Sequence, residues 1–112
     1  MTSLDFFWIW GYGKTSITLT AINDLKYNRF LINKVLVIAP KKVAEDTWIR
    51  EQEKWEHLKL LRVIPVLGSL SKRVKALNTN ADVYVINREN VVWLVDYYKN
   101  DWPFDMVVID EL

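Results

Sequence analysis

The sequence has no cysteine, one histidine, three glycines and three prolines among its 112 residues. Without cysteine it can form neither a disulfide framework nor a thiolate metal site, and His57 alone cannot form a zinc cluster. A chain with so few glycines and prolines has no flexible linker, and its length suits one compact domain. These absences favour a single domain in a reducing compartment, and we expect a cytoplasmic protein.

An excess of charge of one sign is also missing, because 15 basic residues stand against 14 acidic ones and the net charge is +1. A broadly basic surface is therefore excluded, and any contact with nucleic acid must be local. The apolar run Phe6 to Trp10 is far shorter than the roughly 18 to 20 residues that span a bilayer, and no basic stretch precedes it. We predict no membrane association and interpret this run as a buried strand.

The sequence does contain an alternation of short apolar runs with segments of helical period. The runs predicted as strands are Phe6 to Trp10, Val35 to Ala39, Leu61 to Val66, Val83 to Ile86 and Met106 to Ile109. The apolar positions predicted to mark four helices are Ile17, Ala21, Ile22 and Leu25; Ala44, Trp48 and Trp55; Leu70, Val74 and Leu77; and Val91, Leu94, Val95 and Tyr98. Continuous apolar runs suit strands buried on both faces, so we predict an α/β fold, a doubly wound three-layer domain around a mainly parallel sheet.

Two details of these helices follow from spacing and residue type. Trp48 and Trp55 lie seven positions apart, which places both on one helix face, and we expect them to pack in the core. Ser69 or Ser71 is available as the N-cap of the third helix.

A glycine-rich segment, Gly11-Tyr12-Gly13-Lys14-Thr15, follows the first apolar run and precedes the first helical segment. A phosphate-binding loop needs glycine where backbone amides approach phosphate oxygens, a lysine that reaches the β and γ phosphates, and a hydroxyl that holds Mg²⁺. All three occur here in order, so we predict a nucleotide-binding loop that includes Ser16, with Lys14 also acting in catalysis and Thr15 as a metal ligand.

A pair of carboxylates, Asp110 and Glu111, ends the last apolar run. In phosphoryl-transfer sites the first carboxylate of such a pair holds Mg²⁺ and the second activates the attacking water. Because the carboxyl ends of parallel strands meet at one edge of a sheet, we expect these side chains to lie near the glycine-rich loop. The predicted catalytic residues are thus Asp110, Glu111 and Lys14.

Four segments, GYGKT, VLVIAPKKVAEDTW, YVINREN and VVIDEL, resemble motifs I, Ia, Ib and II of Swi/Snf-type ATPases in helicase superfamily two. The resemblance implies that residues 1–112 are a partial helicase ATP-binding domain, the first RecA-like lobe of a P-loop NTPase, incomplete at its C-terminal end. It implies ATP and Mg²⁺ as ligands and nucleic acid, DNA by preference, as partner. Lys41, Lys42, Asn87 and Arg88 would contact the nucleic-acid backbone, although helix N-capping is a competing explanation for Asn87.

The sequence departs from this family at both ends. Trp8 stands where GxxxxGK[ST] has its first glycine, and Trp8 and Trp10 beside the loop are expected to impair nucleotide binding. Ser16 replaces an aliphatic residue and Leu112 a small one. We expect a truncated or frame-shifted phage or bacterial reading frame that lacks the second lobe, turns over ATP negligibly alone, and needs a partner chain over its open sheet edge.

Two other functions are compatible with the residues. A small kinase or GTPase would share the loop and the carboxylate, but the sequence has no Asn-Lys-x-Asp guanine motif and no arginine-rich lid. A non-catalytic α/β remnant or interaction module would bind nucleotide weakly, or bind a partner, without turnover.

Overall fold

The structure of the chain is a computed structural model that describes residues 7–11, 15–29, 32–54 and 61–110. Within these residues the strands form one parallel sheet in the order β1-β5-β2-β4-β3. The strands are β1 (Phe7–Gly11), β2 (Val35–Ala39), β3 (Val63–Val66), β4 (Val83–Asn87) and β5 (Met106–Asp110). The predicted α/β class with a parallel sheet is therefore confirmed.

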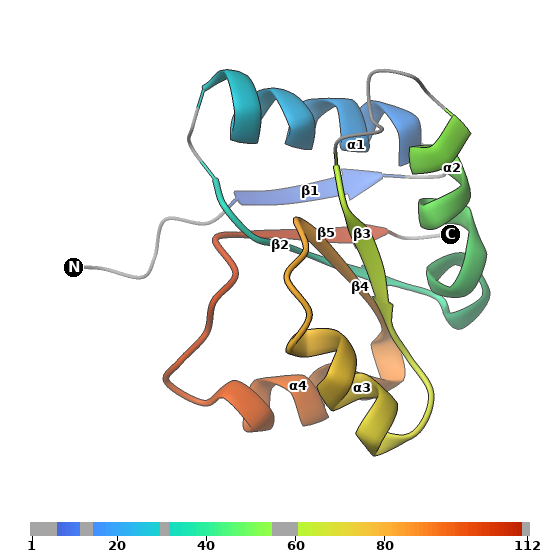
Figure 1. The fold of residues 1–112 in the computed structure, drawn as a ribbon, viewed down its shortest axis with the longest axis vertical. Coiled ribbons are helices and arrows are strands. Elements are labelled where there is room, and N and C mark those ends of the chain that lie inside the picture. Colours follow the sequence, from blue (N-terminus) through green and yellow to red (C-terminus); the bar gives the residue numbers. More distant parts are fainter. Residues whose placement is uncertain (1–6, 12–14, 30–31, 55–60, 111–112) are drawn as a thin grey trace.

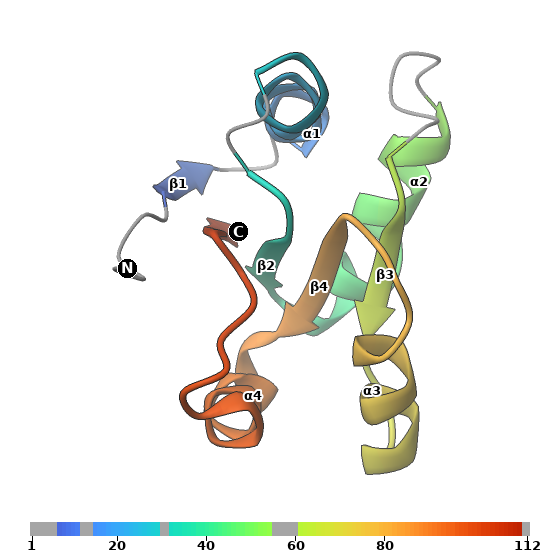
Figure 2. The ribbon, with the colours of Figure 1, turned by 60° about the vertical axis from the view of Figure 1, so that its left-hand side comes forward.

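Helices cover both faces of this sheet. They are α1 (Thr15–Asn23), α2 (Trp48–Lys54), α3 (Leu70–Leu77) and α4 (Val91–Tyr98). A π-helical turn, Asp24–Asn28, continues α1, and a second one, Val43–Thr47, leads into α2. A 3-10 turn, Arg88–Asn90, precedes α4. Figures 1 and 2 show α1 and α2 on one side of the sheet and α3 and α4 on the other, which gives three layers.

The core has two halves because successive strand residues point to opposite faces. Val35 and Val37 of β2 pack toward α1 and α2, where they meet Leu19, Ile22 and Trp48. Leu36 of the same strand packs toward α3 and α4 with Leu77 and Leu94. Burial of each such aliphatic side chain contributes about 1.5 to 3 kcal/mol, so both faces stabilise the sheet.

The strand boundaries differ from the prediction by one or two residues. The first strand extends to Gly11 rather than ending at Trp10, with Phe6 outside the described residues, and the third begins at Val63 rather than Leu61. The fourth and fifth strands each extend one residue further, to Asn87 and Asp110. Polar residues can end a strand because the ladder is made by backbone groups, whatever the side chain.

The apolar stripes of the helices were predicted less well. Among the residues of α1 whose burial is described, Thr18, Leu19 and Ile22 are buried, while Ala21 is only half-buried. The side chain of Ile17 and the whole of Trp55 lie outside the described residues. Trp48 and Ala44 are buried as predicted.

Leu70 and Val95 were expected on the apolar stripes of α3 and α4, and both are exposed. Leu70 begins α3 at the end that lies farther from the sheet (Figure 1). Val95 lies beside the stripe of α4, of which Leu94 is the buried member. The predicted cap is confirmed at Ser69, whose hydroxyl accepts a bond from the backbone N–H of Lys72.

The amino ends of the strands are held by two carboxylates. Asp82, just before β4, is buried and accepts hydrogen bonds from the backbone N–H of Arg62 (2.7 Å) and from the Lys26 ammonium. Asp105, just before β5, accepts bonds from the backbone N–H groups of Asn33 and Lys34. These bonds tie loops to the edge opposite the predicted nucleotide site. Across the part of the chain that is described, no helix has the length and apolar character needed to cross a membrane.

Candidate functional site

The ends of β1 and β5 bring one residue of each predicted motif side by side. Gly11, the last residue of β1, is the parallel register partner of Asp110, the last residue of β5. The expectation that the glycine-rich loop begins at the same sheet edge as the acidic pair is therefore confirmed for these two residues. Tyr12, Gly13, Lys14 and Glu111 lie outside the described residues, so their predicted roles remain predictions.

The helix that follows the loop starts at Thr15. Three residues, 12–14, separate the end of β1 from the start of α1 and lie outside the described residues. The first N–H groups of a helix have no partner within it and carry a partial positive charge, which favours anions such as phosphate. Thr15 and Ser16 occupy the first two positions of α1, and their side chains are not described.

Asp110 is almost completely buried, with 3% of its surface exposed. Its Oδ2 accepts a hydrogen bond of 3.0 Å from Nε1 of Trp48, the first residue of α2. A buried carboxylate requires such a donor because its desolvation is otherwise costly. The sequence predicted Trp48 only as a core residue. A hydrogen bond from it could have been expected, because a buried indole N–H usually needs an acceptor.

The chemistry of this edge suits Mg²⁺ held together with phosphate. Mg²⁺ binds oxygen ligands and is commonly held by one or two carboxylates plus the phosphates of a nucleotide, rather than by a cage of protein groups. Asp110 offers one carboxylate, and the described residues contain no group of three or more His, Cys, Asp or Glu side chains that could hold a metal alone. Asp110 alone could hold Mg²⁺ only together with oxygen ligands from other groups.

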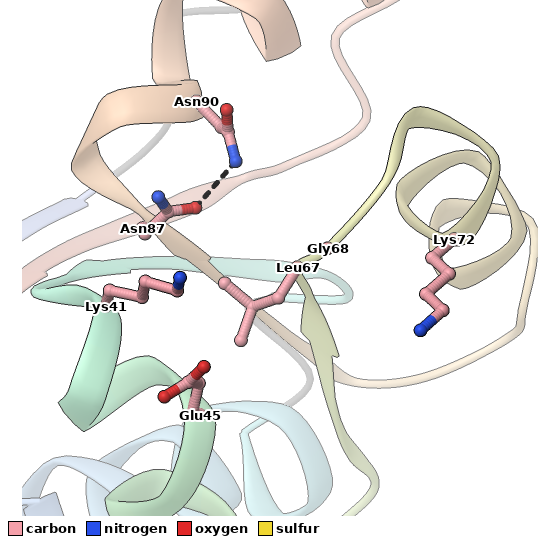
Figure 3. Close-up of a pocket in the computed structure, with 7 residues that line it drawn as sticks. All are labelled: Lys41, Glu45, Leu67, Gly68, Lys72, Asn87 and Asn90. Carbon is pink, nitrogen blue, oxygen red and sulfur yellow. Dashed lines mark hydrogen bonds between the residues drawn. The ribbon is translucent and has the colours of Figure 1, made fainter.

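A second feature of the same edge is a cavity of about 530 Å³ beyond the ends of β2, β3 and β4. Figure 3 shows the side chains around it. The lining residues are Lys41, Glu45, Leu67, Gly68, Lys72, Asn87 and Asn90. Two ammonium groups and two amides surround this hollow, against one carboxylate, so its character is that of a site for an anionic or polar ligand.

Asn87 is fixed by side chains on the turn after β4. Its Nδ2 donates to Oε1 of Glu89 (2.9 Å), and its Oδ1 accepts from Nδ2 of Asn90 (2.8 Å). Asn87 occupies the N-cap position of the 3-10 turn Arg88–Asn90 with an extended backbone, as the competing explanation expects, but its side chain makes no capping bond to the backbone. Its amide bonds its neighbours' side chains instead, which orients both amides at the cavity wall (Figure 3).

Glu89 remains ionised beside this cavity. A hydrogen bond from its own backbone N–H and one from Asn87 hold the pKa of Glu89 below its usual range, and Arg88 and Lys41 add a smaller electrostatic effect. The positive charges of Arg88 and Lys41 are therefore partly offset by the ionised carboxylate of Glu89.

The four predicted nucleic-acid residues divide into two pairs. Lys41 and Asn87 line the cavity, whereas Lys42 and Arg88 are exposed beside it and do not line it. Lys72 and Asn90 line it and were not predicted. Lys72 could have been found from Gly68, which lies four residues before it and follows the end of β3. Gly68 has φ of +90°, a conformation that favours glycine and marks a turn.

Comparison with known protein families gives no match to the chain. The chain is similar to protein p41 of Acyrthosiphon pisum secondary endosymbiont phage 1, with 44% identity over 102 residues. The similar region is 90% of this chain and 22% of the phage protein. The chain thus spans about a fifth of the length of that relative.

Proposed function

We propose that this chain is the ATP-binding portion of a nucleic-acid-dependent, helicase-type ATPase, the first RecA-like lobe of a P-loop motor. The observation that carries the proposal is the pairing of Gly11 with Asp110 at one sheet edge. That pairing brings Gly11, the first residue of the GxGKT segment, next to the buried carboxylate that ends β5. The resemblance to Swi/Snf-type motifs supports the same function, and the longer phage relative has room for further lobes beside the similar segment.

In this proposal, different residues of the chain bind the phosphates of ATP, hold Mg²⁺ and activate the attacking water. Backbone amides of the loop and of the start of α1 bind phosphate oxygens, and Lys14 reaches the β and γ phosphates. Thr15 and Asp110 hold Mg²⁺, which neutralises charge on the phosphates when it is bound. Glu111 orients and deprotonates the attacking water.

The cavity at Lys41 supports a nucleic-acid contact on the same edge. Lys41 and Lys72 supply cations for backbone phosphates, and the amides of Asn87 and Asn90 supply donors for phosphate or sugar oxygens. A nucleic-acid strand bound in this cavity would lie on the same sheet edge as the proposed nucleotide site. An ATP-driven motor needs its two sites to be coupled, and a shared sheet edge allows that.

The proposal is tested by the affinity of the purified chain for a fluorescent ATP analogue, compared with that of Lys14→Ala. Loss of a charge-assisted contact to phosphate costs about 1.5 to 3 kcal/mol, so we expect the variant to bind roughly 10- to 100-fold more weakly. The matched control is Lys75→Ala, which removes an exposed lysine of α3 that does not line the cavity. Equal affinity of the wild type and Lys14→Ala would contradict the proposal and favour a non-catalytic α/β module.

Turnover by the isolated chain is expected to be negligible. An arginine finger from another lobe or subunit contributes about 10³ to 10⁵ in rate in other NTPases. Vigorous hydrolysis by the pure chain, stimulated by DNA, would contradict the requirement for a second lobe.

A further inference from the structure

The indole of Trp48 and the carboxylate of Asp110 form a buried contact between two distant segments. Nε1 of Trp48 donates to Oδ2 of Asp110 over 3.0 Å, and the residues are 62 positions apart in the sequence. Their exposed fractions are 1% and 3%. Trp48 begins α2 and Asp110 ends β5, so the bond joins a helix to the last residue of a strand.

Trp48 is fixed both by packing of its ring and by this hydrogen bond. Its ring belongs to the core half that also contains Val37, Val85 and Val108, on the side of the sheet that α1 and α2 cover. A side chain so enclosed has one position available, and its N–H therefore points in one direction. The carboxylate that accepts this bond is likewise restricted in rotation, although it ends a strand where the chain leaves the sheet.

We propose that Trp48 is a positioning residue of the nucleotide site. Its N–H holds Oδ2 of Asp110 and thereby presents the other carboxylate oxygen to Mg²⁺ bound with a nucleoside triphosphate. Groups that orient a metal ligand in this way contribute about 10- to 100-fold to metal affinity in other proteins. This inference rests on the proposed function, because it assigns Trp48 to the same site.

The test compares the wild type with Trp48→Phe, which keeps an aromatic ring in the core and removes the N–H donor. The measurement is the affinity for a fluorescent ATP analogue, once with Mg²⁺ and once with EDTA. We expect Mg²⁺ to strengthen binding by the wild type, and Trp48→Phe to lose roughly 10-fold or more of that gain with its affinity in EDTA unchanged. Trp102→Phe is the matched control, since Trp102 packs on the opposite face of the sheet.

The outcomes separate this inference from the function on which it rests. A wild type whose nucleotide binding does not respond to Mg²⁺ would contradict the proposed function, and the inference with it. A wild type that responds, together with a Trp48→Phe variant that responds equally, would overturn the inference alone.

A measurement on the unaltered chain covers the case in which Trp48→Phe fails to fold. The indole N–H resonance of Trp48, assigned in the ¹⁵N-labelled wild type, should shift when Mg²⁺ and ATP are added together, and shift less with ATP in EDTA. The indole resonance of Trp102 should not distinguish the two additions. An indole resonance of Trp48 that stays in place while Mg²⁺ and ATP saturate the chain would overturn the inference.

Discussion

Gly11 and Asp110 end neighbouring parallel strands in register with each other, which sets the start of the glycine-rich loop beside the buried carboxylate. Adjacent strands lie about 4.8 Å apart, so a phosphate bound by the loop would be within reach of a metal on Asp110. A chain whose first and last strands were separated in the sheet would need another element to join the two motifs. Here the backbone ladder places Gly11 directly beside Asp110.

Replacement of Asp110 by asparagine tests the role of its charge. The amide oxygen of Asp110→Asn can still accept the bond from Trp48, so the fold should persist, but a neutral amide binds Mg²⁺ poorly. We expect the strengthening of nucleotide binding by Mg²⁺ to fall about 10-fold or more, measured by titration with Mg²⁺ and with EDTA. Asp96→Asn on the exposed side of α4 is the control. An undiminished Mg²⁺ response in Asp110→Asn would refute a metal role for this carboxylate.

Truncation of Trp48 should strongly destabilise the fold. Trp48 is among the largest fully buried side chains, and its removal leaves a cavity and an unpaired carboxylate. For Trp48→Ala we expect a loss of about 3 to 5 kcal/mol in the free energy of unfolding, measured by urea denaturation. Trp93→Ala, at a half-buried position on α4, should cost less. If the two variants were equally stable, Trp48 would not hold the core position described.

The ion pair between Lys26 and Asp82 is expected to matter for stability far more than the exposed pairs. Both side chains are largely buried, with 17% and 10% exposed, and Asp82 also accepts the backbone N–H of Arg62. Asp82→Ala leaves a buried ammonium and an unpaired N–H, so unfolding free energy should fall by about 3 to 5 kcal/mol.

The control for this variant is Arg50→Ala, which breaks the exposed pair with Asp46 and should have no measurable effect. In a double-mutant cycle, Lys26→Met combined with Asp82→Ala should cost less than the sum of the single changes. Additive costs would show that the two groups do not interact.

The cavity lysines are expected to determine affinity for nucleic acid. Lys41→Ala and Lys72→Ala should each weaken binding of a DNA oligonucleotide and reduce the slope of log K against log salt by about 0.7 to 0.9. Lys42→Ala should have a smaller effect, because Lys42 does not line the cavity, and Lys75→Ala should have none. The measurement is fluorescence anisotropy over a range of salt concentrations. A larger effect at Lys42 than at Lys72 would place the contact outside the cavity.

Stability should depend on pH in the alkaline range through Tyr98. Burial raises the pKa of Tyr98 to about 12 from 10.0, with smaller effects of Tyr97 and Tyr84. The pKa of Tyr98 is higher in the folded protein than in the unfolded one, so the unfolded chain loses this proton first as the pH rises. The free energy of unfolding is therefore unaffected below about pH 10 and falls as the pH rises toward about 12. Urea denaturation should show a decline over this range that is reduced in Tyr98→Phe and largely retained in Tyr97→Phe. Identical pH profiles for the wild type and Tyr98→Phe would contradict the shift.

The sequence was sufficient to predict the strands because their signal is local. Runs such as Val35 to Ala39 are apolar at every position, and this is typical of strands covered on both faces. The meeting of Gly11 and Asp110 at one edge followed from the general geometry of parallel sheets. The order of the strands could not be predicted, because it depends on which faces and edges pack together over long separations.

The side-chain partners were harder to predict for the same reason. Trp48 was expected in the core, which is correct, but its bond to Asp110 depends on where α2 lies over β5. Lys72 lines the cavity, and the side chain of Asn87 bonds Glu89 and Asn90 although Asn87 sits at the N-cap position of the turn after β4. Contacts of this kind are set by tertiary geometry rather than by the period of the sequence.

The position of β5 between β1 and β2 affects how the sheet can form during synthesis on the ribosome. Among the described strands, β1 pairs with β5 alone, although β1 is made first and β5 last. The opening apolar strand must therefore wait, without its sheet partner, while β2, β3 and β4 are synthesised. Pairing of β1 is delayed until β5 has been synthesised, whereas β2, β4 and β3 can pair with one another before then, so the apolar residues of β1 stay without a sheet partner for longest.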